Sequence, residues 1–540
     1  MISTRPMDEQ LGGHLASERW TALAWRHWRR LVLAGVFLLA CLLRLQNIED
    51  PAADFHATRQ YRSFLIARAY YFESLNPAPG LPEWMRQAAR ASRERQGVLE
   101  PPLMELAVAT AYRVTGEAVW VPRVLSSLAW LLGGLLLHAI ARRIAGREAG
   151  LCAVTVYLLA PFAVVASRSF QPDPLAVMLL LASVLAVLRY HERQSAARLL
   201  AAAAVSASAI LVKPVVAFAV FGVFGSLTVV KDGVGRSLLN GRALIFSIAS
   251  IAPALVFYGH GLSSGALRGQ AHATFLPHLV LNGFFWKGWL QQIRAVAGLA
   301  PFFAGLLGVL VVRRGLPRAT LVGLWLGYGA FCAVFSYHIA THDYYHLQLI
   351  PIVAMSLGPL LVMVIRNVFE LNPQWYWRAA AGVLALAALG VTAGVAAPRR
   401  AVGEPVRGAR VAAEIGQLVG HSRKVLMLAS DYGLSLEYHG YVSGWPWPLA
   451  SDLEWERLAG VPALEAEERF ESWFARHSPE YFVVLDLREL EGQPDLARFL
   501  SDRFTAAARS VDYVVFDLLR AGSADGRPVA REDRPGLRRR

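Results

Sequence analysis

Long apolar runs occupy the first three quarters of the chain. A helix that crosses a bilayer needs about 20 mostly apolar residues, and fewer where flanking polar groups reach the interface. The pattern therefore predicts an α-helical polytopic membrane protein with about eleven transmembrane helices. The short runs on either side of Lys213–Pro214 form either a hairpin or one kinked helix. The predicted spans are Leu31–Leu45, Val119–Ile140, Ala149–Val165, Pro174–Leu188, Leu199–Val212, Pro214–Val230, Ala243–Phe257, Ala295–Val312, Thr320–Phe335, Leu347–Val364 and Ala379–Ala397.

Basic residues gather in the short loops between these runs. Because Lys and Arg in short loops prefer the cytoplasmic side, the clusters orient the chain. With the spans above, every cluster falls on the side of the N-terminal arginines. This predicts a cytoplasmic N-terminus at 1–30, a membrane domain at 31–397 with a large periplasmic first loop at 46–118, and a periplasmic tail. The clusters are Arg142, Arg143 and Arg147; Arg189, Arg193 and Arg198; Lys231, Arg236 and Arg242; and Arg313, Arg314 and Arg318.

The first loop and the tail have patterns of their own. In the loop, Tyr61, Phe64, Leu65, Ala69 and Phe72 recur at helical spacing, which predicts a helix lying along the membrane interface. In the tail, strand-like and helical patterns alternate, so residues 398–521 are expected to form a small α/β domain. Residues 522–540 are polar and rich in Arg, which favours disorder. The strand-like runs are Lys424–Ala429, Tyr481–Leu485 and Asp512–Leu518, and the helical ones include Val406–Val419 and Leu464–Arg476.

Composition agrees with a membrane protein. Hydrophobic residues make up 55% of the chain and charged residues 17%. The net charge of +14 could suit nucleic-acid binding, but the arginines are dispersed between apolar runs and form no single basic stripe. The three cysteines, Cys41, Cys152 and Cys332, lie inside apolar runs and offer neither a disulfide framework nor zinc-ligand spacing. No small-residue cleavage site follows the first run, which predicts a retained anchor.

Polar residues at the helix ends collect on the non-cytoplasmic face. Charges near membrane helices are costly, so several at one depth indicate a shared polar cavity. The residues on this face are Asp54, His56, Arg59, Glu100, Asp173, Lys213, His342, Asp343, Tyr344, Tyr345 and His346.

Structural alternatives stand beside several of these residues. Asp54 could cap the helix that contains Tyr61, and Asp173 could cap the helix that follows its turn. Lys213 could extend to the lipid headgroups. The run from His342 to His346 is harder to explain structurally; its two histidines have spacing suited to a metal, but no third ligand is evident nearby.

The order of motifs resembles the C-type (GT-C) membrane glycosyltransferases, and more narrowly the bacterial relatives of protein O-mannosyltransferases and of the aminoarabinose transferases that modify lipid A. No single motif is decisive, and the resemblance covers roughly the first three quarters of the chain. The motifs in order are Asp54, Arg59, Ala69–Tyr71, Glu100–Leu103, Gly116, Pro122–Ser126, Ser169–Pro174, Leu211–Pro214 and Asp343–Leu347.

The resemblance implies transfer of a sugar from a polyprenyl-phosphate donor to a lipid, glycan or protein acceptor at the periplasmic face of the bacterial inner membrane, with inversion. It implies a general base at Asp54 and a second acid at Asp173. No cofactor is expected beyond the lipid-linked donor, no metal ligands are assigned, and a need for a divalent metal stays open. Substrate-binding candidates, chiefly for the donor phosphate, are Arg59, Arg62, Glu100, Lys213, His342, Asp343, Tyr345 and His346.

Two departures from the family pattern limit what can be transferred. Lipid A transferases commonly have a basic residue where Glu100 stands here, and many protein mannosyltransferases have a second acid where this chain has Phe55 or His56. Acceptor specificity is therefore not carried over. A transporter or flippase of a lipid-linked sugar is the main alternative, although transporters usually bind near the membrane midplane. A membrane-anchored sensor is a third class.

Overall fold

The computed structural model describes residues 27–74, 80–97, 99–238, 240–264, 276–371, 374–396, 404–458 and 461–521. The chain divides into two compact units. The helical unit comprises Met1–Phe55 and Gly97–Arg400, and the α/β unit comprises His56–Gln96 and Ala401–Arg540. This division differs from the predicted boundaries, because the middle of the first loop joins the tail domain. The predicted disordered segment at 522–540 lies outside the described residues.

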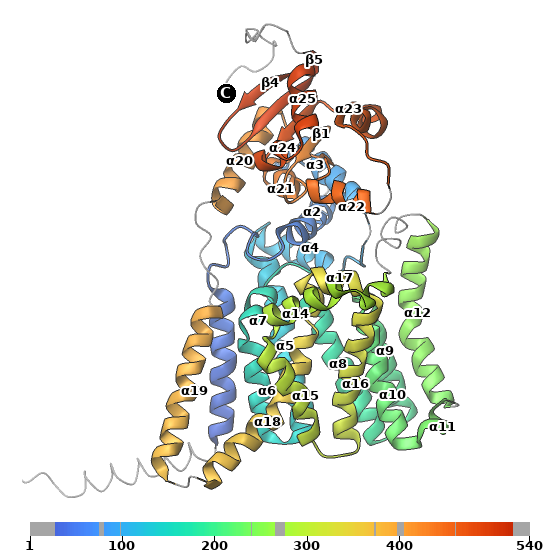
Figure 1. Ribbon diagram of the computed structural model, residues 1–540, viewed down its shortest axis with the longest axis vertical. Helices are drawn as coiled ribbons and strands as arrows, with labels where there is room; N and C mark the ends of the chain where they lie inside the picture. Colours follow the sequence, from blue (N-terminus) through green and yellow to red (C-terminus); the bar gives the residue numbers. More distant parts are fainter. Residues whose placement is uncertain are drawn as a thin grey trace, which may run out of the picture. The chain divides into compact units, whose positions relative to one another are not determined.

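Every predicted span in the helical unit falls on a helix (Figure 1). The first helix covers residues 27–45. The other elements of this unit are α4 (Leu103–Thr115), α5 (Trp120–Ala145), α6 (Arg147–Leu159), α7 (Pro161–Ala166), α8 (Asp173–Glu192), α9 (Ala196–Val212), α10 (Val216–Asp232), α11 (Val234–Leu238), α12 (Gly241–Ser263), η1 (Pro277–Leu281), α14 (Gly283–Val296), α15 (Leu299–Val311), α16 (Leu316–Val334), α17 (Ser336–Thr341), η2 (Asp343–His346), α18 (Leu349–Leu371) and α19 (Trp375–Ala396).

Four described helices, α5, α8, α12 and α18, are long and apolar enough to cross a membrane. The number rises to five if α14 and α15, which are bent by 91° at their junction, form one broken span. Two of the other predicted spans correspond to shorter helices, since α9 and α10 have 17 residues each. The count of about eleven therefore stays a prediction.

Prolines mark two breaks between helices: one lies inside the predicted span Ala149–Val165, and the other lies between the spans Leu199–Val212 and Pro214–Val230. Ala160 separates α6 from α7, and Pro161 opens the second helix, where its missing N–H costs nothing. At Lys213–Pro214, α9 ends and α10 begins at Val216. The chain therefore forms two separate helices here, and the candidate site residue Lys213 lies in the break.

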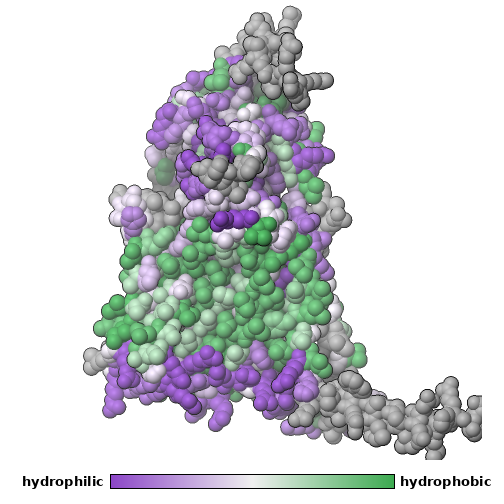
Figure 2. Space-filling view, turned by 180° about the vertical axis from the view of Figure 1, so that it is seen from behind, coloured by the Kyte–Doolittle hydropathy of each residue, from purple (hydrophilic) through white to green (hydrophobic). Residues whose placement is uncertain are grey.

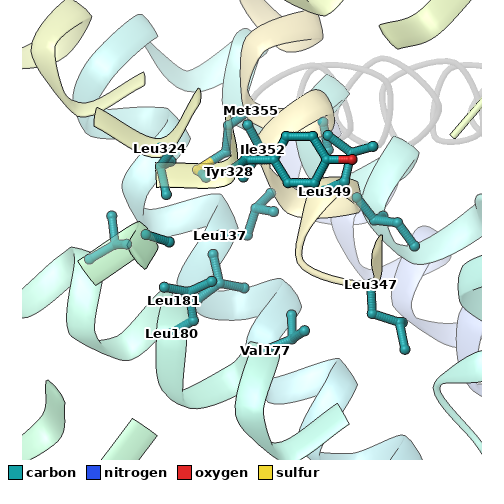
Figure 3. Close-up of a cluster of buried hydrophobic side chains, with 14 of the residues drawn as sticks. Leu137, Val177, Leu180, Leu181, Leu324, Tyr328, Leu347, Leu349, Ile352 and Met355 are labelled. Atoms are coloured by element: carbon teal, nitrogen blue, oxygen red, sulfur yellow. The ribbon is translucent and has the colours of Figure 1, made fainter. Parts of the chain in front are cut away.

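The core of the helical unit is an apolar cluster to which most of its helices contribute. Leu137 of α5, Val177 and Leu181 of α8, Leu324 of α16 and Ile352 of α18 are all buried within it (Figure 3). Leu347 and Leu349 of the same cluster flank the start of α18, directly after the His342–His346 run. This packing fixes the turn that precedes α18.

Helices α10 and α16 approach each other through glycines. A Cβ added at Gly222 would collide with the backbone of Gly323 and Gly327, and one added at Gly327 would collide with the backbone of Phe218. Small residues at four-residue spacing allow this close backbone approach in membrane helices. We call the contact of Gly222 with Gly323 and Gly327 the glycine seam.

The surface of the helical unit changes from hydrophobic to hydrophilic along the direction of the helix axes (Figure 2). A broad hydrophobic belt is bounded at one end by a hydrophilic band (Figure 2). The basic clusters lie at the helix ends and turns on that side, for example at the end of α5, the end of α10 and the turn between α15 and α16. We call this end the Arg rim. Its exposed members include Arg142, Arg143, Arg147, Arg189, Arg193, Lys231, Arg236, Arg242, Arg313 and Arg314.

The α/β unit contains a mixed five-stranded sheet in the order β2-β1-β3-β5-β4. Strands β1, β2 and β3 are parallel, whereas β5 is antiparallel to β3 and β4. The three predicted strand-like runs correspond to β1, β3 and β5, and β2 and β4 were missed. The elements are α20 (Glu404–Leu418), β1 (Val425–Leu428), α21 (Leu434–Gly440), β2 (Gly444–Pro446), α22 (Ala450–Leu458), α23 (Ala466–Arg469), η3 (Phe470–Phe474), η4 (Ala475–His477), β3 (Tyr481–Val484), α24 (Leu487–Glu491), α25 (Pro494–Arg503), β4 (Phe504–Arg509) and β5 (Val514–Ala521).

The helices of the first loop, α2 (Ala57–Ser74) and α3 (Glu83–Arg95), belong to this unit. The apolar face of α2 is buried, with Phe64 stacking near Tyr438 of α21 at 5.2 Å between ring centroids. Arg68 is also buried and donates to the Tyr438 carbonyl at 2.6 Å. The apolar stripe of α2 is therefore covered by α21 and not left for lipid. The position of this helix along the membrane interface stays a prediction.

A carboxylic acid is buried in the same unit. Glu437 of α21 accepts a hydrogen bond from the Gly444 N–H at 3.3 Å, and Gln96 donates to its other oxygen at 3.5 Å. Burial raises the pKa of Glu437 to about 7. This carboxyl group therefore titrates near neutral pH.

Candidate active site

Asp54 lies between two buried arginines at the end of the helical unit opposite the Arg rim. Arg123 Nη2 donates to Asp54 Oδ1 at 3.0 Å, and Arg168 Nε is 3.5 Å from Asp54 Oδ2. The two arginine side chains are 1% exposed, whereas the Asp54 side chain is 23% exposed. Asp54 is thus held by two buried guanidinium groups while its own side chain stays partly exposed.

The same arginines organise the turn that carries Asp54. Arg123 donates to the carbonyls of Asn47, Ile48 and Pro51 at 3.1 to 3.3 Å. Arg168 donates to the Gln46 carbonyl at 2.5 Å and the Asn47 carbonyl at 2.9 Å. Because a guanidinium has five N–H donors in a fixed plane, each arginine can fix both the backbone and the carboxylate.

Asp173 and Lys213 form a buried ion pair. Asp173 is the first residue of α8, and Lys213 is the residue at which α9 ends. Lys213 Nζ donates to Asp173 Oδ1, and the side chains are 8% and 4% exposed. Lys213 therefore points inward to Asp173, and Asp173 follows Pro172, which is the N-cap residue of α8.

Aromatic and imidazole rings surround this ion pair. Lys213 Nζ lies 5.4 Å from the ring centroid of Tyr344 and 5.2 Å from that of Tyr345, within cation–π range. The rings of His338 of α17 and Tyr345 are tilted against each other, with 5.0 Å between their centroids. His338 also lies close enough to Lys213 for an electrostatic interaction. We define the Lys213 cluster as Asp173, Lys213, His338, His342, Tyr344 and Tyr345.

The two histidines of the predicted run differ in environment. His342 is half-buried, and its Nδ1 lies 2.7 Å from the Thr341 hydroxyl. His346 is fully buried; its Nε2 donates to the Ile339 carbonyl at 2.8 Å, so its Nδ1 accepts from the Tyr328 hydroxyl at 2.7 Å. Burial lowers the pKa of His346 to about 4, which makes the ring neutral at pH 7. Asp343 opens the short helix η2 and is half-buried.

The remaining candidates fall in two places. Glu100 precedes α4 in the helical unit and lies close enough to Tyr258 of α12 for an electrostatic interaction. Tyr258 donates to the carbonyl of Leu211, two residues before Lys213, at 3.4 Å. Arg59 and Arg62 lie on α2 in the α/β unit, and Arg62 donates to the Gln96 carbonyl at 3.3 Å.

Sequence reasoning missed four residues of this region: Arg123, Arg168, His338 and Tyr328. A signal for the arginines was present. Arg123 at the start of α5 and Arg168 after α7 lie at the helix ends opposite the Arg rim, against the preference of Arg for the cytoplasmic side. An arginine at these helix ends predicts a buried acidic or carbonyl partner. Nothing in the sequence indicated that Tyr328 would meet His346.

Several buried polar atoms in this region have no hydrogen-bond partner among the described residues. They include both amide atoms of Gln171, both amide atoms of Gln348, Asp173 Oδ2, His338 Nδ1, and the Nε atoms of Arg123 and Arg168. A buried polar atom without a partner is costly, so water or a ligand is expected to satisfy these atoms. Gln171 and Asp173 belong to one turn, and Asp173 binds Lys213. The buried polar atoms of this turn that have no hydrogen-bond partner therefore lie close to Lys213.

The described residues contain no group of three or more His, Cys, Asp or Glu side chains arranged to hold a metal ion. His342 and His346, which have metal-like spacing, do not gain a third ligand.

Comparisons with known proteins place this geometry in a known fold. Residues 99–257 match the family model described as dolichyl-phosphate-mannose-protein mannosyltransferase. No curated protein matches the chain. The crystal structure of ArnT from Cupriavidus metallidurans bound to undecaprenyl phosphate is similar, with 16% identity, coverage of 92% of this chain and 99% of ArnT, and a TM-score of 0.58. The chain has the GT-C fold.

A second GT-C structure agrees. The archaeal oligosaccharyltransferase AglB from Archaeoglobus fulgidus, in complex with an inhibitory peptide and a dolichol-phosphate, is 12% identical, with coverage of 94% of this chain and 75% of AglB and a TM-score of 0.55. The predicted resemblance to GT-C proteins is confirmed at the level of fold. With its membrane-spanning helices, this GT-C chain is a multi-pass membrane protein.

Proposed function

We propose that this chain is a membrane glycosyltransferase that moves a sugar from a polyprenyl-phosphate donor to a lipid, glycan or protein acceptor, with inversion. The observation that carries the proposal is the placement of two acid–base pairs, Asp54 with its arginines and Asp173 with Lys213, at one end of a GT-C helical unit. Transfer of this kind needs a base for the acceptor and cations for the departing phosphate, and both are present there.

The reaction has a simple balance. An acceptor O–H or N–H attacks the anomeric carbon, the bond between that carbon and the phosphate oxygen breaks, and polyprenyl phosphate leaves as an anion. The acceptor proton passes to Asp54, whose side chain is 23% exposed although Arg123 and Arg168 beside it are buried. The two arginines hold the carboxylate and its turn in place, which is the kind of preorganised support that efficient proton transfer needs.

Lys213 is the proposed contact of the donor phosphate. A phosphate entering the Lys213 cluster would compete with Asp173 for the ammonium group, and the Tyr345 and His342 side chains border the same group. Asp173 then acts as the second acid, which positions Lys213 when no donor is present. Because both partners are buried, the charge on Lys213 is only weakly screened and is well suited to stabilise a developing phosphate anion.

The other candidates have supporting roles in this proposal. The carboxylates of Asp343 and Glu100 can accept hydrogen bonds from hydroxyl groups of the sugar or of the acceptor substrate. Arg59 and Arg62 are cations for the donor phosphate or for an anionic acceptor substrate. His346 is neutral and engaged at both ring nitrogens, so it positions η2 through Tyr328 and does not serve as a cation.

The proposed location is the bacterial inner membrane. The Arg rim favours a cytoplasmic position for that end of the helices. The N-terminus would then be cytoplasmic, and Asp54, Lys213 and the α/β unit would be periplasmic. Cysteine labelling from outside intact cells tests this orientation: a single added cysteine at Glu49 should react, and one at Arg236 should not.

Activity is tested with the purified full chain in lipid nanodiscs. The chain is supplied with polyprenyl-phosphate pentoses and hexoses that carry a label in the sugar, together with a membrane extract as acceptor. Release of polyprenyl phosphate with transfer of label is the expected result. Movement of the labelled donor across a vesicle membrane without release of polyprenyl phosphate would instead establish the flippase alternative and overturn the proposal.

A further inference from the structure

A polar cavity lies at the Arg rim of the helical unit. Its volume is about 550 Å³, and it is lined by residues from three separate parts of the chain. Arg142 and Arg143 come from the end of α5, Arg313 from the turn between α15 and α16, and Arg366 from the second half of α18. Four guanidinium groups thus converge from parts of the chain that are far apart in sequence.

The cavity carries an excess of positive charge. Glu370 is the single acid among its lining residues. Arg366 lies 3.9 Å from Glu148, which Arg29 also approaches at 2.5 Å, and Arg143 lies 3.8 Å from Glu192. Within the described ranges, the guanidinium groups of Arg142 and Arg313 have neither an ion pair nor a hydrogen bond. Two arginines are therefore available to an anion.

The same cavity also has an apolar side. Val311, Pro359, Val362 and Met363 line it together with the arginines. Met363 is exposed at the outer surface of α18. A site of this composition can take a molecule with a charged head and an apolar body, and its volume is in the usual range for ligand sites.

This cavity is separate from the proposed active site. Arg123 and Arg142 lie 19 residues apart on the single helix α5. At 1.5 Å per residue, about 28 Å of helix separates them. The cavity therefore does not belong to the donor phosphate site.

We propose that this cavity binds the phosphodiester headgroup of an anionic phospholipid. Arg142 and Arg313 would contact the phosphate oxygens, since guanidinium groups bind phosphate through paired hydrogen bonds. The acyl chains would follow the apolar side toward the hydrophobic belt. Basic pockets between membrane helices at the cytoplasmic side are suited to anionic lipid headgroups, and such a lipid would join α5, α18 and the turn between α15 and α16.

The inference is tested by lipid binding to the purified full chain. Detergent-solubilised protein is titrated with phosphatidylglycerol or phosphatidylcholine, and bound lipid is counted by native mass spectrometry. The test variant is Arg142→Gln/Arg313→Gln. The matched control is Arg236→Gln/Arg314→Gln, which removes the same charge from exposed arginines of the Arg rim outside the cavity.

We expect wild type and control to retain phosphatidylglycerol in preference to phosphatidylcholine, and the test variant to bind phosphatidylglycerol roughly tenfold more weakly or worse. Equal losses in test variant and control would show general charge attraction and overturn the proposal, as would unchanged binding in the test variant. Displacement of the lipid by millimolar inorganic phosphate would show a site for a soluble anion and would also contradict it. Matching melting temperatures confirm that the variants are folded.

Discussion

Lys213 and Asp173 are joined in a buried ion pair, although 40 residues separate them in the sequence. Each partner sits where a helix begins or ends: Asp173 opens α8, and Lys213 follows α9. Taking two charges out of water is costly, and a pair of this kind is often no more stabilising than apolar residues of similar volume. Its presence here, beside the unsatisfied Asp173 Oδ2, is more readily explained by function than by stability.

Replacing Lys213 by alanine should weaken donor binding and destabilise the protein. Removal of one partner leaves a buried carboxylate without its counter-charge, which typically costs about 3–5 kcal/mol. The double variant Lys213→Met/Asp173→Asn should recover much of the stability without recovering donor affinity. Thermal unfolding and binding of a labelled polyprenyl-phosphate sugar are the measurements. A folded double variant with wild-type donor affinity would remove Lys213 from the phosphate site.

Asp54→Asn should lower turnover by a factor of about a hundred or more, because general-base assistance is typically worth that much. The amide keeps the shape of the side chain and can still accept from Arg123, so the turn should persist. Glu49→Gln, an exposed substitution in the same turn, is the matched control and should leave turnover unchanged. Near-normal turnover in a well-folded Asp54→Asn protein would limit Asp54 to holding the loop.

Tyr328→Phe should destabilise the helical unit by about 1–3 kcal/mol, because His346 Nδ1 is left buried without its donor. Tyr337→Phe serves as the control, since no hydrogen bond of its hydroxyl is found within the described ranges. Urea or thermal unfolding of both variants measures the difference. Equal stability of the two variants would show that the Tyr328 hydroxyl contributes nothing.

Glu437→Gln should change the pH dependence of the stability of the α/β unit. Because the pKa of Glu437 is raised to about 7, the folded state binds more protons than the unfolded state between the ordinary Glu pKa of about 4.3 and pH 7. Stability from this group is therefore present at low pH and lost as the pH rises through 7. The variant lacks this loss, so its advantage over wild type should grow to about 3 kcal/mol at pH 8.

The measurement for Glu437 is the difference in melting temperature between wild type and variant at pH 5 and pH 8, taken on the full chain. Subtracting wild type from variant removes the opposite contribution of His439, whose pKa burial lowers to about 4. Glu491→Gln is the control, because Glu491 is exposed in the same unit. A difference that does not vary with pH would mean that the Glu437 carboxyl does not titrate in this range.

The sequence predicted the helices well and their surroundings less well. The apolar runs located the helices of the helical unit, because a membrane helix must satisfy its backbone internally and expose apolar side chains. The number of helices that cross the membrane stays a prediction. The apolar pattern could not decide what covers α2, whose buried face meets α21 in the α/β unit. Strands β2 and β4 were missed for a related reason: β2 has only three residues, and β4 has a largely polar or small composition.

The candidate site was predictable in residue type but not in pairing. A shared face for Asp173, Lys213 and Tyr345 follows from counting spans, since each lies at a helix end. That Lys213 would meet Asp173 depends on α9 packing against α8, a tertiary choice that no local pattern records. His338 escaped notice because it precedes the polar run by four residues and has no local feature in the sequence that separates it from an ordinary helical residue.

The glycine seam constrains how a long lipid tail can reach Lys213. Helix α10 begins just beyond Lys213, and α16 carries Tyr328, the partner of His346; Gly222, Gly323 and Gly327 leave no slack between these two helices. Helices α10 and α16 are therefore expected to move together as one rigid pair. The lipid tail of the proposed donor must then enter between other helices of the unit. Bulky substitutions in the glycine seam should impair folding before they alter entry of the donor.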